Sequence, residues 1–273
     1  MFQRKIKSSR IGSAVTLLEL IYHTTVRNVR QSHGNALIGL MLNIMQTVIL
    51  VVAFYVMASV LGIRRGVPGG DFLVFLMSGI FLYLSHIKAM GAVVGSEGPA
   101  SAMMKHAPMN TIIAIAGAAI GALYIQVLTL VVVLFFYHVA ITPVEIFQPV
   151  AAFGMLLVAW FSGVSIGMVL LAIKPWLPSF IDIVSIIYAR ANMIASGKMF
   201  LANALPANRR ALFDWNPLFH TIDQSRGYAF LNYNPHYSSI SYPLILSIVF
   251  LMIGLMGEFY TRKHASISWS AKR

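Results

Sequence analysis

The feature that most constrains this chain is a series of long apolar segments without a charged side chain. Segments 36–61, 111–139 and 149–173 contain no Asp, Glu, Lys or Arg. An α-helix rises about 1.5 Å per residue, so each segment is long enough to cross a hydrocarbon layer of about 30 Å. A helix also satisfies its own backbone hydrogen bonds, which lipid cannot do. The pattern therefore predicts an all-α integral membrane protein.

The composition agrees with this prediction and excludes a soluble enzyme. Of the 273 residues, 58% are hydrophobic and only 10% are charged, whereas about a quarter of the residues of a soluble domain are charged. The formal charge of +12 fits cytoplasmic loops or an anionic cargo better than a nucleic-acid partner. Cysteine is absent, so disulfides and cysteine nucleophiles are excluded.

Six membrane spans are predicted within a single domain that covers residues 1–273. The spans are 36–61, 72–94, 111–139, 149–173, 179–203 and 243–260. Lys and Arg near the ends of spans favour the cytoplasmic side of a membrane. Most of these residues lie there if both termini are cytoplasmic. We therefore expect a multi-pass protein whose N- and C-termini face the cytoplasm.

The segment before the first span, 1–33, is basic and contains an amphipathic stretch. At 100° per residue, one set of mostly apolar side chains falls on a single face, and several charged side chains gather on another. The apolar face consists of Ala14, Val15, Leu18, Ile21, Tyr22, Thr25, Val26 and Val29. This pattern predicts a helix in the cytoplasmic membrane interface. The alternative is a core helix of a small soluble cap.

Two connections between the spans are expected to carry structure of their own. Segment 96–108 contains a stretch bracketed by Pro99 and Pro108, which predicts a cytoplasmic helix of under three turns. Segment 204–241 is too apolar and aromatic for a disordered linker, and it is expected on the external side. An interfacial aromatic belt accounts for most of its rings, and a sugar-binding surface is the alternative.

Three charged residues in the fifth predicted span are candidates for a functional site, because a charge inside a bilayer is costly. Asp182, Arg190 and Lys198 are spaced by eight residues. Consecutive members then stand about 12 Å apart along a helix axis, too far for an ion pair on one helix. Two interpretations remain open. Either the residues line a water-filled route for an anionic cargo, or they bond to neighbouring helices and hold the bundle.

Motifs that would indicate catalysis are weak or absent. Residues 163–167 match G-x-S-x-G, but a hydrolase elbow lies between a strand and a helix, whereas these residues lie inside an apolar span. Small residues four apart, here and at Gly117 and Gly121, favour close helix packing instead. The histidines lack metal-site spacing and no P-loop motif is present. We therefore expect neither a metal nor an ATP site in this chain.

Two groups of short motifs follow one another in a recognisable order. The first comprises Ser196-Gly197, Leu205-Pro206, Asn216-Pro217-Leu218 and Arg226, and the second is Met-Met-Lys-His-Ala-Pro-Met at residues 103–109. In these motifs and in its expected topology, essentially the whole chain resembles the permease subunit of type 2 ABC transporters. The members it resembles export capsular polysaccharide across the bacterial inner membrane. The segment 103–109 is similar to the cytoplasmic coupling segment of these permeases.

The resemblance implies a transport subunit rather than an enzyme. Two such permeases form a homodimer and bind two ATP-binding subunits, which supply the ATP and Mg site. An acidic, lipid-linked polysaccharide would pass along the dimer interface, with periplasmic export proteins as further partners. Segment 204–241 would fold back into the outer leaflet as a re-entrant segment, and membrane lipid would surround the whole.

Three sets of site residues are expected, the second from the charges within the fifth predicted span and the other two from this resemblance. The residues expected to couple to the ATPase are Glu97, Met103, Met104, Lys105 and His106. The residues expected along the translocation path are Asp182, Arg190 and Lys198. The residues expected to shape the external re-entrant segment are Asn216, Pro217 and Arg226.

Two rival functional classes stay open. A type 2 exporter of another cargo, such as O-antigen, teichoic acid or a drug, would keep the same spans and the same ATPase contact. A membrane-embedded transferase would need convergent acid and base groups. Asp214, Asp223 and His220 are the candidates for those groups, provided that the fold brings them together.

Overall fold

The computed structural model describes residues 10–31, 36–60, 62, 71–96 and 111–264. Within these ranges all regular secondary structure is helical. Five of the helices are long and apolar enough to cross a membrane, which indicates a multi-pass membrane protein. The prediction of an all-α membrane protein is confirmed at this level.

The five apolar helices lie close to predicted spans. They are α2 (Ala36–Val60), α3 (Phe72–Val94), α5 (Thr111–Ala140), α6 (Pro149–Ile173) and α10 (Ser241–His264). Helices α3 and α6 begin and end at the predicted residues, while α10 is longer than the prediction at both ends. Pro149 can begin α6 because the first residue of a helix needs no N–H for an intrahelical bond.

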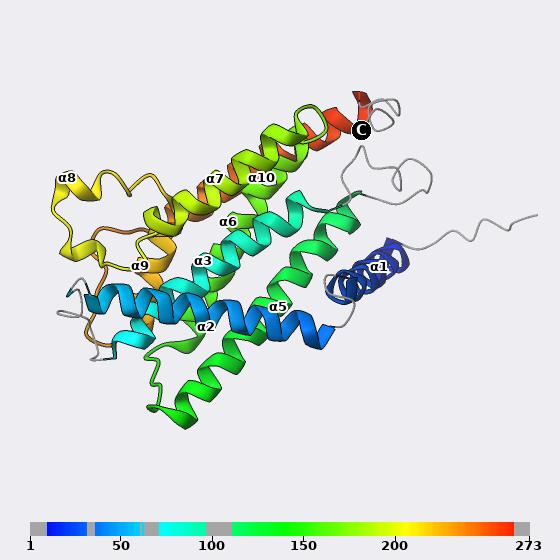
Figure 1. Cartoon of the computed structure of the whole chain (residues 1–273). Helices are drawn as coiled ribbons and strands as arrows, with labels where there is room; N and C mark the ends of the chain where they lie inside the picture. The colour runs from blue at the N-terminus through cyan, green and yellow to red at the C-terminus, as the bar shows by residue number, and fades with distance from the viewer. Residues whose placement is uncertain (1–9, 32–35, 61, 63–70, 97–110, 265–273) are drawn as a thin grey trace, which may run out of the picture.

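Helix α7 (Pro178–Ala195) corrects the fifth predicted span, which was expected to reach residue 203. It is not among the five apolar helices. It ends early because Gly197 has a φ of 74°, a left-handed conformation that glycine adopts without strain and that stops a helix. In Figure 1, α7 still runs the length of the bundle, from the end of α6 toward α8 and α9.

The long connection after α7 folds into short helices. These are η1 (Ala202–Ala204), α8 (Ala207–Arg210) and α9 (Pro217–Ala229). Helix α9 packs against α3 and α6 and is largely buried. The prediction that this connection is not a disordered linker is therefore confirmed.

The core of the bundle forms where α3 and α6 pack together through glycines. A Cβ atom at Gly163 would lie 2.1 Å from the carbonyl oxygen of His86, and one at Gly167 would lie 2.9 Å from that of Met90. Helix backbones can approach so closely only where side chains are missing. The packing interpretation of the G-x-S-x-G stretch is thus confirmed. Ser165 Oγ donates to the carbonyl oxygen of Phe161 on its own helix, at 2.8 Å.

Helix α1 (Arg10–Gln31) packs on α5 through its second half. A Cβ atom at Gly117 would lie 2.7 Å from Cγ2 of the buried Thr24. Val15 and Leu18 in the first half of α1, and Tyr22 just after it, are exposed. An exposed apolar face on a basic helix is typical of a membrane interface.

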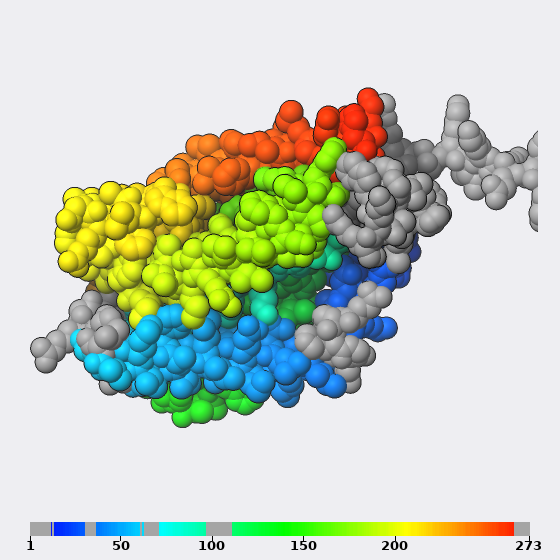
Figure 2. All heavy atoms as spheres, turned by 45° about the horizontal axis from the view of Figure 1, so that its top comes forward, coloured from blue at the N-terminus to red at the C-terminus, as the bar shows by residue number. Residues whose placement is uncertain are grey.

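The bundle has two distinct ends, which Figure 1 shows plainly. Helix α1 and the last turns of α10 lie at one end, and α8 and α9 lie at the other. Helix α7 is at the surface of the space-filling view, which brings the upper side of the bundle forward (Figure 2). The described chain therefore begins and finishes at the same end.

Candidate functional site

The residues predicted to couple to an ATPase are Glu97, Met103, Met104, Lys105 and His106, and all of them lie outside the described residues. Their role stays a prediction. The described chain stops just before them at Ser96, after Gly95 has capped α3 by donating its N–H to the carbonyl oxygen of Gly91 at 2.9 Å. Ser96 lines the same pocket as Asn28 of α1. The described chain before the predicted coupling segment therefore ends close to α1.

Asp182 forms an ion pair across the turn between α6 and α7. Its Oδ1 lies 3.3 Å from Nζ of Lys174. Lys174 Nζ also donates to the carbonyl oxygen of Val94, at 3.2 Å, and so ties this turn to the end of α3. The contacts of Asp182 accordingly match the bundle-holding interpretation. The spacing of the three charges did not reveal this pair, because Lys174 lies in the turn before α7, outside the fifth predicted span.

Arg190 is the exposed cation on α7. Ile183, Ile187 and Ile194 lie on the same stripe of the helix and are 56%, 60% and 75% exposed. No carboxylate of the described residues lies within 4.0 Å of Arg190. The outer face of α7 therefore presents one cation inside an apolar stripe, with no described helix packed over it.

The inner face of α7 is held by buried polar side chains. His86 of α3 is fully buried, and its Nε2 lies 2.8 Å from the hydroxyl of Tyr188. Its Nδ1 lies 2.8 Å from Oγ of Ser162 on α6. The hydroxyl of Tyr83 also donates to the carbonyl oxygen of Ala189, at 3.0 Å. These bonds join α3, α6 and α7.

No spacing rule could have assembled His86, Ser162 and Tyr188, because they come from three helices. The available signal was the presence of polar side chains within apolar spans, where an unsatisfied polar group costs several kcal/mol (about 2–7). That signal marks each residue as bonded. It does not say which other helix provides the partner.

Lys198 lies just after α7 and is 1% exposed. Its Nζ sits 3.8 Å from the ring centroid of Tyr83 and 4.5 Å from that of Phe54. No hydrogen-bond acceptor among the described residues reaches this ammonium group. Cation–π attraction to the two rings is its electrostatic support. Lys198 is therefore buried within the bundle, whereas Arg190 is exposed on its surface.

Arg226 of α9 bonds to residues 197–200, the segment just after α7; this contact is called the joint between α7 and α9. The side chain is fully buried and donates to the carbonyl oxygens of Gly197, Lys198 and Phe200 at 2.9, 2.5 and 2.6 Å. Its guanidinium carbon lies 3.9 Å from the ring centroid of Phe75. Burial lowers the pKa of Arg226 to about 10, although Asp223 and Tyr233 raise it, so the group remains charged at neutral pH.

Asn216 and Pro217 start α9 at the same joint. The Asn216 side-chain oxygen accepts from the N–H of Leu218 at 3.0 Å, and Pro217 occupies the first helical position. The Asn216 amide nitrogen donates to Oδ1 of Asn192 at 2.9 Å and to the carbonyl oxygen of Ala195 at 3.0 Å. The structure therefore brings Asn216 and Arg226 to the Gly197–Lys198 joint, whereas Asp182 and Arg190 lie along α7.

Two of the three candidates for a transferase site, Asp223 and His220, use their side chains to hold the segment after α7. The Asp223 carboxylate accepts from the hydroxyls of Tyr233 and Ser238 at 2.5 and 2.7 Å. His220 bonds to the backbone on both sides, through Nε2 to the carbonyl oxygen of Asp214 and through Nδ1 from the N–H of Ser239. Oδ2 of Asp214 lies 3.8 Å from Nε of Arg210, and its Oδ1 has no hydrogen-bond partner among the described residues.

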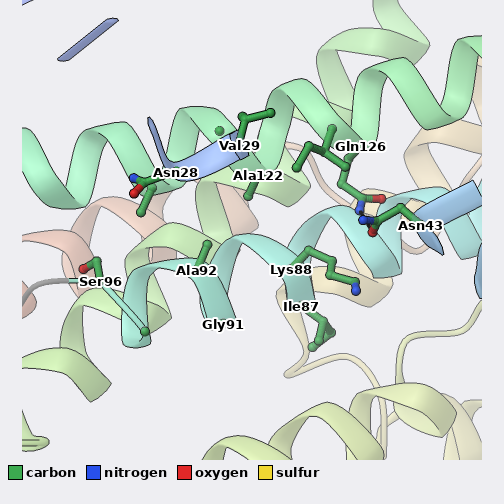
Figure 3. A pocket seen from close by; sticks show the side chains of 14 residues that line it. Asn28, Val29, Asn43, Ile87, Lys88, Gly91, Ala92, Ser96, Ala122 and Gln126 are labelled. Atoms are coloured by element: carbon green, nitrogen blue, oxygen red, sulfur yellow. Dashed lines mark hydrogen bonds between the residues drawn. The ribbon is translucent and has the colours of Figure 1, made fainter. Parts of the chain in front are cut away.

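A pocket of about 450 Å³ opens between α1, α2, α3 and α5. Figure 3 shows Asn28, Asn43, Lys88 and Gln126 around it, with Gly91 and Ala92 on the wall formed by α3. Lys88 Nζ donates to Oε1 of Gln46 at 2.7 Å. No carboxylate of the described chain lies within 4.0 Å of Lys88. The hollow thus combines one cation, Lys88, with the amide side chains of Asn28, Asn43 and Gln126.

The described residues contain no group of three His, Cys, Asp or Glu side chains that could hold a metal ion. No protein-family model matches the chain, and no curated protein matches it either. The described arrangement is a helical membrane bundle with a charged, uncovered helix face and a basic pocket.

Proposed function

We propose that this chain is the membrane-spanning permease subunit of an ATP-driven exporter in the bacterial inner membrane. Its cargo is an acidic, lipid-linked capsular polysaccharide. Two copies form a homodimer and bind two ATP-binding subunits, which hold ATP and Mg and perform the hydrolysis. Periplasmic export proteins receive the cargo on the far side.

The observation that carries this proposal is the position of Arg190 in the uncovered stripe of α7. A cation surrounded by lipid is costly, by at least about 2.5 kcal/mol near the bilayer centre. The same cation becomes favourable where a second protein surface and water meet it. A second copy that packs on Ile183 and Ile187 would create such a lined route, and Arg190 would offer positive charge to acidic sugars or to a lipid phosphate.

The arrangement of the helices supports six crossings. The described chain begins with α1 and finishes with α10 at the same end of the bundle (Figure 1). An even number of crossings is needed to return to the starting side. Since five helices qualify by length and composition, α7 is the sixth crossing in this proposal. Its lower hydropathy then results from its polar residues, among them Arg190, which faces the route in this proposal.

The same arrangement supports opposite roles for the two ends. The end with α1 is cytoplasmic in this proposal, and the predicted coupling segment leaves α3 there, after Ser96. The end with α8 and α9 is external, and segment 204–241 lies beside the exit as the re-entrant segment. The buried Arg226 joint then holds this segment against α3 while α7 moves.

Co-expression with an ATP-binding subunit from the same genome tests the proposal. We expect the two proteins to purify together from detergent-solubilised membranes. Lys105→Glu should lower ATP hydrolysis by the complex at least fivefold without reducing the amount of membrane-inserted permease. Lys263→Glu is the matched control, because Lys263 is exposed near the end of α10. A fully active Lys105→Glu complex would contradict the coupling assignment.

The cargo requires its own measurement, because exporters of O-antigen, teichoic acid or a drug would share this architecture. Cells that lack the chain should accumulate acidic polysaccharide in the cytoplasm, and the wild-type chain should restore export. If the wild-type chain restores export of a different glycan, the exporter function stands and the assigned cargo is wrong. If no ATP-binding protein purifies with the chain, the proposal that it is an ATP-driven exporter is contradicted as well.

A further inference from the structure

The pocket between α1, α2, α3 and α5 has the chemical features of a lipid-binding site. Its wall on α3 and α5 is hollow because small residues line it, among them Gly91, Ala92, Gly121 and Ala122. Gly91 faces open space, since a Cβ atom there would meet nothing within 4 Å. A hollow alone identifies no ligand, but its polar side chains restrict the choice.

The first restriction is charge. Lys88 lies six residues before the end of α3, or about 9 Å along the axis. Its Nζ has an amide oxygen as its hydrogen-bond partner and no carboxylate within reach among the described side chains. Such a cation at the edge of an apolar bundle attracts an anion. The amide side chains of Asn28 and Asn43 in the same pocket can donate to phosphate oxygens.

The second restriction comes from Gln126, which is 3% exposed. Its Nε2 donates to Oδ1 of Asn43 at 3.5 Å, while its Oε1 has no donor among the described residues. An unpaired buried acceptor costs about 1–3 kcal/mol. Rotation of the Gln126 amide toward the pocket would let a ligand hydroxyl pair with it. The ligand should therefore carry hydroxyl groups as well as a negative charge.

The third restriction is the apolar groove of about 410 Å³ on the same helices. The groove starts at Ile44, directly after Asn43 on α2, and continues past Val133, two turns beyond Gln126 on α5. Leu73 and Met77 of α3 form its base. A polar pocket and an apolar groove that lie one after the other along α2 and α5 suit an amphipathic molecule with a charged head and an acyl chain.

We infer that the pocket between α1, α2, α3 and α5 binds an anionic phospholipid of the surrounding membrane, of the phosphatidylglycerol class. The phosphate pairs with Lys88, the glycerol hydroxyls reach the amides of Asn43 and Gln126, and an acyl chain follows the groove at Ile44. The lipid is held within one copy of the chain. It therefore bridges α1 to α3 and α5, independently of any exporter activity.

The test measures lipid that remains with the purified chain. The protein is extracted in mild detergent, exchanged into lipid-free buffer, and analysed by native mass spectrometry before and after addition of dioleoyl phosphatidylglycerol or dioleoyl phosphatidylcholine. We expect about one phosphatidylglycerol per chain and at least a tenfold preference over phosphatidylcholine. Equal binding of the two lipids, or of neither, would overturn the inference.

Two variants locate the site. Lys88→Met should lower phosphatidylglycerol occupancy at least fivefold, while the matched control Lys263→Met should leave it unchanged. Gly91→Leu fills the pocket from a position with free space around it, and it should remove binding while the chain stays helical and monodisperse. Undiminished occupancy in Gly91→Leu would place the lipid elsewhere, so this variant remains decisive even if Lys88→Met fails to fold.

A competition experiment distinguishes a membrane phospholipid from a soluble phosphate ester as the ligand of the pocket. Glycerol phosphate is added at millimolar concentration in competition with phosphatidylglycerol. We expect it to displace less than a tenth of the lipid, because it cannot use the apolar groove. Complete displacement would show that the pocket binds a soluble phosphate ester, and it would contradict the inference of a membrane lipid.

Discussion

Gly163 of α6 faces the main-chain carbonyl of His86 in α3 so closely that a Cβ atom would lie 2.1 Å from the oxygen. The contact joins two backbones, and no side chain can move aside to relieve it. It also sets the distance at which the His86 ring reaches Ser162 on α6 and Tyr188 on α7. The contact at Gly163 thus sets both the approach of α3 to α6 and the position of the His86 ring that bonds to α7.

Gly163→Ala should destabilise the bundle because the added methyl group forces α3 and α6 apart. Overpacking of this kind costs about 1–3 kcal/mol, which thermal unfolding in detergent would register as a lower midpoint. Gly154→Ala is the matched control on the same helix, since a Cβ atom there meets nothing within 4 Å. The control should be neutral or slightly stabilising. Equal effects of the two changes would contradict the close backbone contact.

Arg226→Lys should destabilise the joint between α7 and α9 although it keeps the charge. A lysine ammonium cannot span the carbonyl oxygens of Gly197, Lys198 and Phe200 as the planar guanidinium does. Buried acceptors left without donors cost about 1–3 kcal/mol each. Arg209→Lys, on the exposed side of α8, should have no measurable effect on the unfolding midpoint. An unchanged unfolding midpoint for Arg226→Lys would contradict a structural role of the three Arg226 hydrogen bonds.

Ile187→Cys should form a disulfide-linked dimer in oxidised membranes if a second copy packs on α7. The chain contains no cysteine, so the introduced thiol can pair only with its copy or with another protein. Ile248→Cys on α10 is the matched control, because the two side chains are 60% and 52% exposed. We expect cross-linking at residue 187 and little at residue 248. The reverse result would move the dimer interface to α10.

Arg190→Gln should reduce export at least fivefold while the protein level in the membrane stays constant. The substitution removes the cation from the uncovered stripe of α7 and leaves the buried inner face intact. Asp182→Asn is the comparison, because Asp182 is paired with Lys174. Normal export by Arg190→Gln would separate Arg190 from the cargo route.

Asp71 should make stability depend on pH at the start of α3. Burial raises the pKa of this carboxyl, but hydrogen bonds from Tyr137, Thr142 and two backbone N–H groups outweigh it and lower the pKa below 3.8. The stabilisation is therefore complete above pH 3.8 and is lost as pH falls through the lowered pKa.

Asp71→Asn tests this dependence, because asparagine still caps the helix but carries no charge. At pH 7 we expect the variant to be less stable by about 1 kcal/mol. The difference between wild type and variant should shrink as pH falls below 4, followed by thermal unfolding. A difference that is constant between pH 7 and pH 3 would show that the charge of Asp71 contributes nothing.

Local properties of the sequence were enough to place most helices. The uncharged lengths of α2, α5 and α6, the proline at the start of α6 and the small residues at Gly163 and Gly167 are all local features. Each one predicts a structure because lipid solvation and helix geometry act on neighbouring residues. The limits of α3 and α6 were therefore predictable to the residue, and so was the use of the two glycines in packing.

Contacts between distant residues were not predictable in this way. The sequence placed Asp182, Arg190 and Lys198 on one span, yet the fold gives them three environments: an ion pair with Lys174, an exposed stripe, and a cage of two rings. Gly197 separates Lys198 from α7 by its left-handed backbone, and helix periodicity carries no information about such a turn.

What the sequence determined by itself is the class of protein: an all-α chain with membrane-crossing helices, because apolar segments of that length have no other stable setting. What only the tertiary structure decided is which polar groups meet. His86 with Tyr188, Arg226 with the carbonyl oxygens around Gly197, and Lys88 with the pocket beside Gln126 come from helices far apart in the chain. Their partners depend on how those helices cross, which is set by packing across the whole bundle and not by any local pattern.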